Sequence, residues 1–263
     1  MSARDDSRLA CVPWRDLVSL NRIEVVRELL ISVPWLVLSI LAEWSQMYPA
    51  ALTASFMFFL TGLRQVHNAY HYALGISRRA TEWAMFALSI LMLGSMHAVQ
   101  INHLRHHRDC LGPDDVEAMS ARLPAWRALL IGPWFPLRLH AKALAVATPK
   151  QRRWILAELA ANLLWIALVF AVFEQPVLEY HVLAMLTGQC LTAFFAVWTV
   201  HHDAAGAPFP ARTIRDPWKA RVSYAMFYHV EHHLFPAVPT CHLRLLAVRL
   251  DAVTPDLTVL RVF

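Results

Sequence analysis

Three groups of histidines stand at spacings that would place their imidazoles together on one side of a helix. They are HNAYH, with His67 and His71, HLRHH, with His103, His106 and His107, and HVEHH, with His229, His232 and His233. His201 stands alone between the second and third groups. Because residues three and four positions apart lie on one helix face, each group aims its imidazoles into one volume. Imidazole binds zinc, copper, iron and nickel, so the pattern predicts a metal site.

The number of histidines indicates more than one metal ion. Nine of the 14 histidines stand in these groups or at His201, which is too many for one ion and suits two, at four or five ligands each. The sequence contains neither HExxH nor ExxH, which argues against a zinc protease and against a carboxylate-bridged di-iron bundle. The remaining interpretation is a dinuclear centre held by histidines alone, with the element left open.

Each metal-bound imidazole needs a partner for its second ring nitrogen, usually a carboxylate or a carbonyl. The nearest candidates in the sequence are Asn102, Asp109, Asp114, Asp115, Asp203 and Glu231. Glu231 is the strongest of them, because it lies inside the third histidine group. His202 could replace its neighbour His201 as a ligand.

The elements that must position these histidines belong to a membrane protein by composition. Apolar residues make up 57% of the chain, charged residues make up 16%, and the mean hydropathy is +0.40. The 24 Lys and Arg residues, against 19 Asp and Glu, come without a basic helix or a zinc-finger spacing, so we expect no nucleic-acid partner. Four apolar stretches predict membrane spans, at Leu29–Trp44, Tyr48–Leu63, Ile155–Phe173 and Tyr180–Val200.

The four spans pair in sequence as two hairpins. Their turns, at 43–49 and 174–181, contain no Lys or Arg, whereas arginines precede the first span and KQRR at 150–153 precedes the third. The positive-inside tendency then predicts a multi-pass protein with both termini and the histidine groups on the cytoplasmic face.

A fifth apolar stretch, at 83–99, lies between the first and second histidine groups. If it crossed the membrane, the two groups would face opposite compartments and could not share a site. We therefore predict an interfacial or re-entrant helix beneath a cytoplasmic, histidine-rich cap. The region 124–149, with its internal prolines, predicts a second interfacial segment, and residues 1–263 predict one domain.

The order HxxxH, HxxHH and HxxHH, with hydrophobic hairpins before the second and the third group, resembles the membrane fatty-acid desaturase family. The resemblance covers roughly residues 25–245 and is most specific in YHVEHHLFPAVP, at 228–239. It implies an all-α membrane fold with four transmembrane helices, two iron ions that activate O₂, and attack on an unactivated C–H bond of a lipid chain. The resemblance makes ligands of the eight grouped histidines, and His201 matches an additional histidine that many members have.

Within that family, the resemblance implies a desaturase that acts on a lipid or fatty-acyl chain. An acyl hydroxylase or a carotenoid ketolase or hydroxylase is the alternative in the same family, and a histidine-rich membrane metal transporter is the alternative of another class. The sequence has no haem-binding HPGG segment, no cysteine cluster and no glycine-rich nucleotide motif. We therefore expect electrons to come from a separate protein, of the ferredoxin or small cytochrome type.

Overall fold

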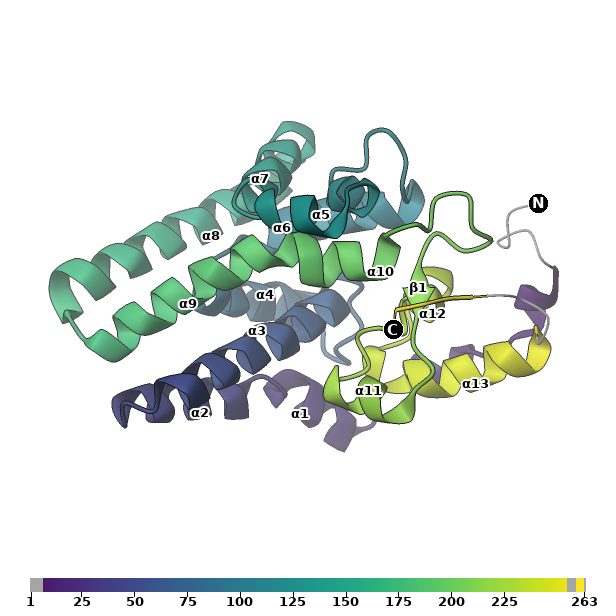
Figure 1. Cartoon of the computed structure of the whole chain (residues 1–263), viewed down its shortest axis with the longest axis horizontal. Coiled ribbons are helices and arrows are strands. Elements are labelled where there is room, and N and C mark those ends of the chain that lie inside the picture. Colours follow the sequence, from purple (N-terminus) through teal and green to yellow (C-terminus); the bar gives the residue numbers. More distant parts are fainter. Residues whose placement is uncertain (1–6, 255–258, 263) are drawn as a thin grey trace.

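The structure, a computed structural model, describes residues 7–254 and 259–262. Its regular elements are almost all helices (Figure 1). Those before residue 130 are η2 (Ser7–Cys11), η3 (Arg15–Leu17), α1 (Arg22–Leu30), α2 (Val33–Trp44), α3 (Tyr48–Tyr70), α4 (Arg78–Met92), α5 (Met96–Arg108), η4 (Glu117–Arg122) and α6 (Ala125–Leu130). Those after it are α7 (Trp134–Val146), α8 (Pro149–Leu168), η5 (Val169–Phe173), α9 (Pro176–Thr192), η6 (Ala193–Trp198), α10 (Thr199–His201), α11 (Pro217–Val222), α12 (His229–Leu234), η7 (Thr240–His242) and α13 (Leu243–Val253).

Several helices begin where a short polar side chain can accept a hydrogen bond from the first turn. Asn21, Ser77, Ser95 and Thr148 each accept from the backbone N–H three residues further on, at the starts of α1, α4, α5 and α8. Such a cap satisfies one of the N–H groups that the first turn leaves without a partner. The starts of the helices that carry or support the histidines are thus fixed locally.

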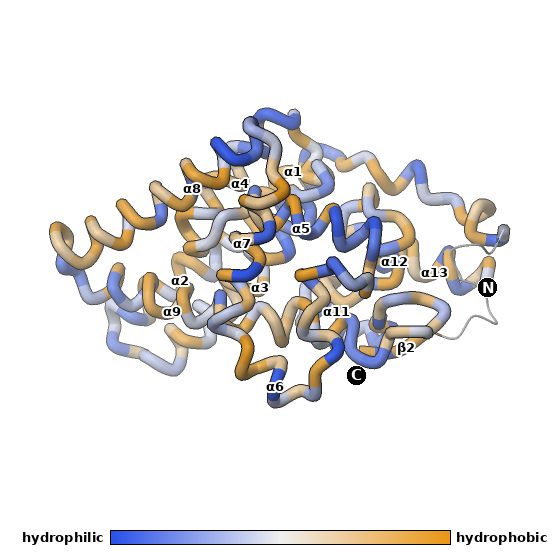
Figure 2. Tube along the Cα trace, turned by 90° about the horizontal axis from the view of Figure 1, so that it is seen from above, coloured by the Kyte–Doolittle hydropathy of each residue, from blue (hydrophilic) through white to orange (hydrophobic). Residues whose placement is uncertain are grey.

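Three helical stretches are long and apolar enough to cross a membrane. They are Arg22–Trp44, Pro149–Phe173 and Pro176–His201, and most of each stretch is not buried inside the protein. In Figure 2 the end of the molecule that carries α2, α8 and α9 is largely orange, which marks hydrophobic residues, or pale, which marks intermediate hydropathy. These stretches contain three of the four predicted spans, and the partner of an apolar helix surface of this kind is lipid.

The predicted span at Tyr48–Leu63 lies in α3, which is not among those three stretches. The helix continues to Tyr70, and its last two turns carry Arg64, Gln65 and Asn68, all buried in protein. The apolar part of α3 packs against α2, to which a short turn joins it. The fourth span, at Tyr48–Leu63, therefore stays a prediction.

The stretch predicted as re-entrant contains a sharp break. Helices α4 and α5 are bent by 112° across residues 93–95, and together they are long and apolar enough to cross a membrane. Leu93 has the left-handed backbone conformation, with φ of 55°, and Ser95 caps α5. A bent pair of this kind is either a broken span or a re-entrant segment, so the re-entrant interpretation and the count of four spans stay predictions.

A buried carboxylate fixes this bend. Glu158 of α8 accepts hydrogen bonds from the Ser95 hydroxyl at 2.5 Å and from the His97 backbone N–H at 3.1 Å, and its other oxygen lies 2.7 Å from His97 Nδ1. The Ser95 backbone N–H donates to His140 of α7 at 3.0 Å. Helix α5, which carries HLRHH, therefore leaves the bend in a direction that α7 and α8 determine.

The region 124–149, predicted as one interfacial segment, forms two helices. Residues 131–133 interrupt it between α6 and α7, where Pro133 takes the N-cap position of α7. Trp126, Trp134 and Leu137 are exposed along it, as expected for residues that face lipid head groups.

The last part of the chain packs on a core of its own around α13. Leu243, Leu246 and Leu250 are buried there against residues that precede and follow α12. Two short parallel strands, β1 (Arg212–Thr213) and β2 (Leu260–Arg261), pair beside it. This subdomain holds the third histidine group against the helices of the first two (Figure 1).

Candidate metal centre

All nine histidines that the sequence predicted as ligands lie in one region, although they come from four separate helices. His67 lies in α3 and His71 caps its end, α5 supplies three histidines, α10 supplies His201, and α12 supplies three. Six of the nine are buried. The residues divide into two neighbouring sets according to where their Nε2 atoms point.

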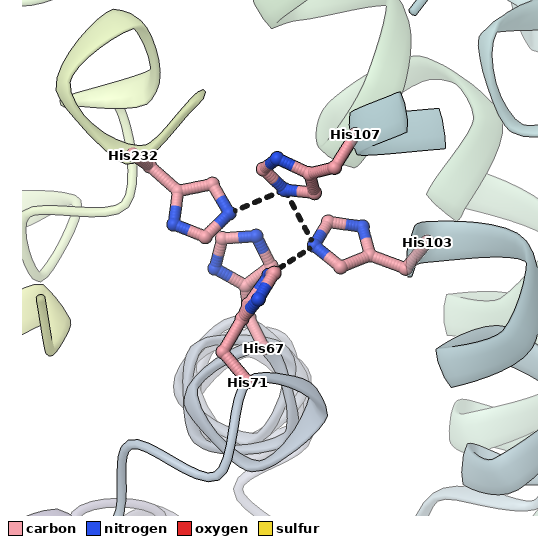
Figure 3. A group of neighbouring side chains, drawn as sticks. All are labelled: His67, His71, His103, His107 and His232. Atoms are coloured by element: carbon pink, nitrogen blue, oxygen red, sulfur yellow. Dashed lines mark hydrogen bonds between the residues drawn. The ribbon is translucent and has the colours of Figure 1, made fainter. Parts of the chain in front are cut away.

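The first imidazole group consists of His67, His71, His103, His107 and His232, whose ligand atoms all lie within 4.8 Å of one another. Figure 3 shows the rings converging from three directions, with His67 and His71 rising from α3. The Nε2 atom of His103 lies 3.0 Å from that of His71 and 3.1 Å from that of His107. The Nε2 atoms of His107 and His232 are 2.8 Å apart.

The second imidazole group consists of His106, His201, His229 and His233. Their Nε2 atoms form a closed ring, with His106 to His201 at 3.1 Å, His201 to His229 at 2.9 Å, His229 to His233 at 3.2 Å and His233 to His106 at 3.3 Å. The two groups are adjacent, since the rings of His107 and His233 stack with centroids 4.4 Å apart. Helix α5 serves both groups because His103 and His107 are four residues apart, whereas His106 points to the other side.

The second ring nitrogens of several ligands have partners in the protein. His103 Nδ1 lies 2.7 Å from Glu117 Oε1, and His106 Nδ1 lies 2.7 Å from Asp115 Oδ2. His201 Nδ1 donates to the carbonyl oxygen of Pro210 at 2.7 Å. These contacts fix the orientation of each ring and direct its Nε2 atom into the group, the arrangement that metal-binding histidines require.

The contact of His201 also decides where its lone pair points. A carbonyl oxygen can only accept, so Nδ1 carries the hydrogen, and in a neutral imidazole Nε2 then has a bare lone pair. That Nε2 atom faces the Nε2 atoms of His106 and His229 at 3.1 and 2.9 Å. Two nitrogens that bind a metal ion at 90° to each other, with bonds of about 2.1 Å, lie about 3.0 Å apart. The residues present therefore fit a metal ion in each group.

The ligands outside the apolar helices are held in the neutral form that binds metal. Burial, followed by the neighbouring imidazoles, keeps the pKa of His229, His232 and His233 well below the ordinary value. Burial lowers the pKa of His71 to about 4. Burial acts to raise the pKa of Asp115, but the hydrogen bonds from His106 and from two backbone N–H groups outweigh it, so this pKa lies below its usual value.

The predicted partners of the imidazoles fall into two classes. Asp115 contacts a ligand, as described above. Glu231, the strongest candidate, is fully buried but pairs with Arg215 at 2.6 Å and accepts from the Thr213 hydroxyl at 2.6 Å, and no contact joins it to an imidazole of the described residues. Its side chain holds the start of α12 to β1. It therefore positions the helix and does not orient an imidazole ring.

The other candidates point elsewhere. The Asn102 amide donates to the carbonyl oxygens of Ala98 and Leu139, and Asp203 and Asp114 are exposed next to basic side chains. Asp109 ends α5 and packs on Gly112. His202 stacks on the Trp198 ring with centroids 3.9 Å apart and lies outside both imidazole groups.

Sequence reasoning did not identify three contributors. Glu117 begins η4, fourteen residues after His103, and the Pro210 carbonyl lies in an irregular loop. Cys110 follows α5, with its Sγ atom 3.6 Å from His106 Nε2 and 3.9 Å from His201 Nδ1. Its position four residues after His106, on the same helix face, is the only signal that could have identified it.

The segment before His201 is a π-helix, η6, which interrupts the α-helical hydrogen bonding between α9 and α10. A π-turn widens the helix by one residue and rotates the side chains that follow it, and such turns are frequent at functional sites. The Trp198 indole N–H donates to the Leu123 carbonyl oxygen at 2.8 Å and anchors this segment. The turn therefore determines that His201, and not His202, enters the second imidazole group.

Two apolar cavities lead to the histidines. A small one, of about 80 Å³, is lined by His67, His103 and His229 together with apolar side chains. A larger groove, of about 360 Å³, lies between α3 and α9 on the apolar part of the molecule. Leu63 and Phe195 line both, so the two spaces meet at these side chains.

Comparison with known proteins bears on the resemblance noted in the sequence. A search among curated proteins finds no match to this chain. The family model described as fatty acid desaturase matches residues 42–262, which is most of the chain and includes all nine histidines of the two imidazole groups. The predicted family is thereby confirmed: the chain belongs to the fatty acid desaturase family.

Proposed function

We propose that this chain is a membrane oxidoreductase that uses two iron ions and O₂ to attack an unactivated C–H bond of a lipid or fatty-acyl chain, as a desaturase. The observation that carries the proposal is the ring of Nε2 atoms in the second imidazole group, where the bare Nε2 of His201 faces those of His106 and His229 at the spacing of ligands around a metal ion. The family supports an oxidoreductase that acts on fatty-acyl chains.

The chain's own residues would divide the work as follows. The first imidazole group would hold one iron and the second the other, and when bound the irons would supply O₂ activation and the removal of hydrogen from carbon. Asp115, Glu117 and the Pro210 carbonyl would keep the rings of His106, His103 and His201 oriented. None of these groups needs to move during turnover, because each already points its histidine into the centre.

The substrate would reach the centre from the membrane. The groove between α3 and α9 is lined almost entirely by carbon atoms of residues such as Phe56, Phe59 and Leu183. An acyl chain that lay in it and passed between Leu63 and Phe195 would bring a methylene group to His67 and His229. Apolar walls bind such a chain in proportion to the area they cover and keep water from the reacting carbon.

The remaining parts of the proposal concern membrane sidedness and electrons. Arginines precede the first apolar helix, and KQRR, at 150–153, stands at the start of α8. Both support a cytoplasmic location for the termini and the metal centre. The sequence carries no haem or nucleotide motif, so a ferredoxin or small cytochrome would deliver electrons from that side.

The first experiment is elemental mass spectrometry of the detergent-purified protein. We expect about two irons per chain. His232→Ala removes a ligand of the first group and should lower the iron content, while circular dichroism shows that the protein remains folded. Zinc in place of iron, or no stoichiometric metal in folded protein, would contradict the di-iron proposal.

Product analysis then separates the reactions within the family. The protein is expressed in a host that supplies fatty-acyl lipids, and the lipids are compared by mass spectrometry with those of a His232→Ala control. A loss of two mass units marks desaturation, and a gain of sixteen marks hydroxylation. An oxidised carotenoid in a carotenoid-producing host, with unchanged acyl chains, would assign the alternative substrate.

A further inference from the structure

A second large groove, separate from the apolar path to the histidines, lies on another face of the protein. Its volume is about 840 Å³, and it runs between α1, the loop that follows α11, and the start of α13. These helices lie together along the lower edge of Figure 1. The groove shares no lining residue with either of the two apolar cavities.

The groove is strongly basic. Arg27, Arg64, Arg221 and Arg244 line it, and none of its lining residues is acidic. Among the residues that the structure describes, Arg221 and Arg244 have no acidic side chain within ion-pair distance, and both are exposed at the rim. Two carboxylates lie near these arginines: Glu28, which is buried and pairs with Arg64 and Arg27, and Glu24, which is close to Arg27. Neither pairs with Arg221 or Arg244.

Arg64 is the most informative of the four arginines. Its side chain is 4% exposed, and one guanidinium nitrogen donates to Glu28 at 2.8 Å. Its Nε and its other terminal nitrogen are buried and have no hydrogen-bond partner in the part of the chain that the structure describes. Buried donors without an acceptor cost free energy, and those of a charged group cost most. Glu28 thus satisfies only part of the donor capacity of this side chain, whose charge adds to that of the other arginines along the groove.

The part of the groove that α1 and α2 form is apolar except for Arg27. Val26, Leu30 and Pro34 line it, and all three are exposed. They belong to the beginning of Arg22–Trp44, a helix long and apolar enough to cross a membrane. The groove therefore joins an anion-binding end to a surface that continues along a lipid-facing helix.

We propose that this groove binds one anionic phospholipid, with the phosphate against Arg64 and the rim arginines and the acyl chains along α1 and α2. Four guanidinium groups suit a phosphate, to which arginine donates two parallel hydrogen bonds. Basic pockets beside membrane helices on the cytoplasmic side bind such head groups. A phospholipid also covers the apolar residues Val26, Leu30 and Pro34 that line the groove beside the arginines, which a protein carboxylate alone does not.

The site is linked to the metal centre by a short chain of hydrogen bonds. Glu28 accepts from Arg64 and, at 3.0 Å, from the Asn68 amide, and Asn68 follows His67 in α3. The side-chain oxygen of Asn68, Oδ1, accepts hydrogen bonds from the Thr240 hydroxyl at 2.7 Å and from the Thr240 backbone N–H at 3.0 Å. A bound lipid would thus stabilise the contact between α3 and the subdomain that carries α12.

The test is native mass spectrometry of the purified full-length protein, titrated with phosphatidylglycerol, phosphatidylcholine or inorganic phosphate. The variant is Arg221→Gln with Arg244→Gln, because both side chains are exposed and their replacement leaves the buried Arg64–Glu28 pair intact. The matched control is Arg153→Gln, another exposed arginine, at the start of α8 and outside the groove.

We expect one phosphatidylglycerol to bind in preference to phosphatidylcholine, and its dissociation constant to rise about 30-fold in the double variant, at about 1 kcal/mol for each basic residue. The control should keep its affinity. Equal binding of the two lipids, unchanged affinity in the double variant, or displacement of the lipid by inorganic phosphate at equal concentration would overturn the proposal. Loss of binding to an acidic electron-donor protein, with lipid binding unchanged, would also overturn it and assign the groove to that protein.

Discussion

His106 and His201 are 95 residues apart in the chain, yet their Nε2 atoms lie 3.1 Å apart and both second nitrogens already have acceptors, Asp115 Oδ2 and the Pro210 carbonyl. The two rings thus point their metal-binding atoms at the same place from helices of different parts of the fold. With both hydrogens on Nδ1, two neutral rings have no hydrogen left to share between their Nε2 atoms. A metal ion between them would bind both lone pairs.

Adjacent histidines at the end of the last apolar helix offer a matched pair of variants. His201→Ala removes a ligand of the second imidazole group, and we expect the iron content to fall by about one ion per chain. His202→Ala removes a ring that stacks on Trp198, so the iron content should stay unchanged. Elemental mass spectrometry measures the iron content of both variants. Equal loss in the two would mean that the π-turn does not select between them.

The carboxylate behind His106 should control metal affinity without binding the metal. Asp115→Asn keeps the shape of the side chain but removes its charge, and we expect metal affinity to fall about 10- to 100-fold. Asp114→Asn is the control, since that side chain is 79% exposed and contacts no imidazole. Competition with a chelator gives the affinities. An unchanged affinity in Asp115→Asn would show that the contact only positions η4.

The junction of the two apolar cavities should limit the passage of an acyl chain. Leu63→Trp adds a ring where Leu63 and Phe195 meet, and we expect turnover to fall about 10²-fold through misplacement of the substrate, with the iron content retained. Leu164→Trp, on an exposed position of α8, is the control. Product formation and iron content are measured on the same preparation. Full activity in Leu63→Trp would mean that the substrate takes another path.

The metal-free protein should lose stability as the pH falls. The pKa of His71 is lowered by burial to about 4, and the pKa values of His229, His232 and His233 are lowered in the same way. Unfolded histidines titrate near 6.5, so between that pH and about 4 the unfolded chain binds more protons than the folded one. The free energy of unfolding therefore rises with pH across this window. Above the window, the stabilising contribution of these imidazoles is complete.

The measurement is the thermal midpoint of chelator-treated protein between pH 7.5 and 5. We expect the midpoint to fall steadily towards pH 5, and to fall less in a His229→Gln variant, which lacks one titrating imidazole. A midpoint that rises towards pH 5 would mean that the folded state carries protonated imidazoles.

The grouping of the histidines could be predicted from sequence because their spacing is local, and their role as metal ligands stays a prediction. Spacing by three and four residues puts His103 and His107 on one helix face whatever the surrounding fold. The assignment of His106 to a different group from His107 needed the structure, because it depends on which neighbour lies on each side of α5. Glu117 and the Pro210 carbonyl escaped prediction because irregular segments bring them to the rings, and such segments carry no periodic signal.

Two elements show where sequence reasoning stopped. The apolar stretch Tyr48–Leu63 stays a predicted span, and the structure adds that α3 runs on through Arg64 and Asn68, whose partner Glu28 lies on a different helix. Glu231 was favoured as a partner of an imidazole because it lies within HVEHH, yet the carboxylate pairs with Arg215. Both arrangements depend on a contact between distant segments, and position in the sequence does not contain that information.

The spread of the ligands along the chain has a consequence for biosynthesis. Each imidazole group takes a member from α12, the last histidine-bearing helix of the two groups. A nascent chain emerges from its N-terminus onwards, so neither group can be completed before residues 232 and 233 have left the ribosome. On the proposal that each group holds an iron ion, the newly made chain would bind its full metal complement only after α12 has been made.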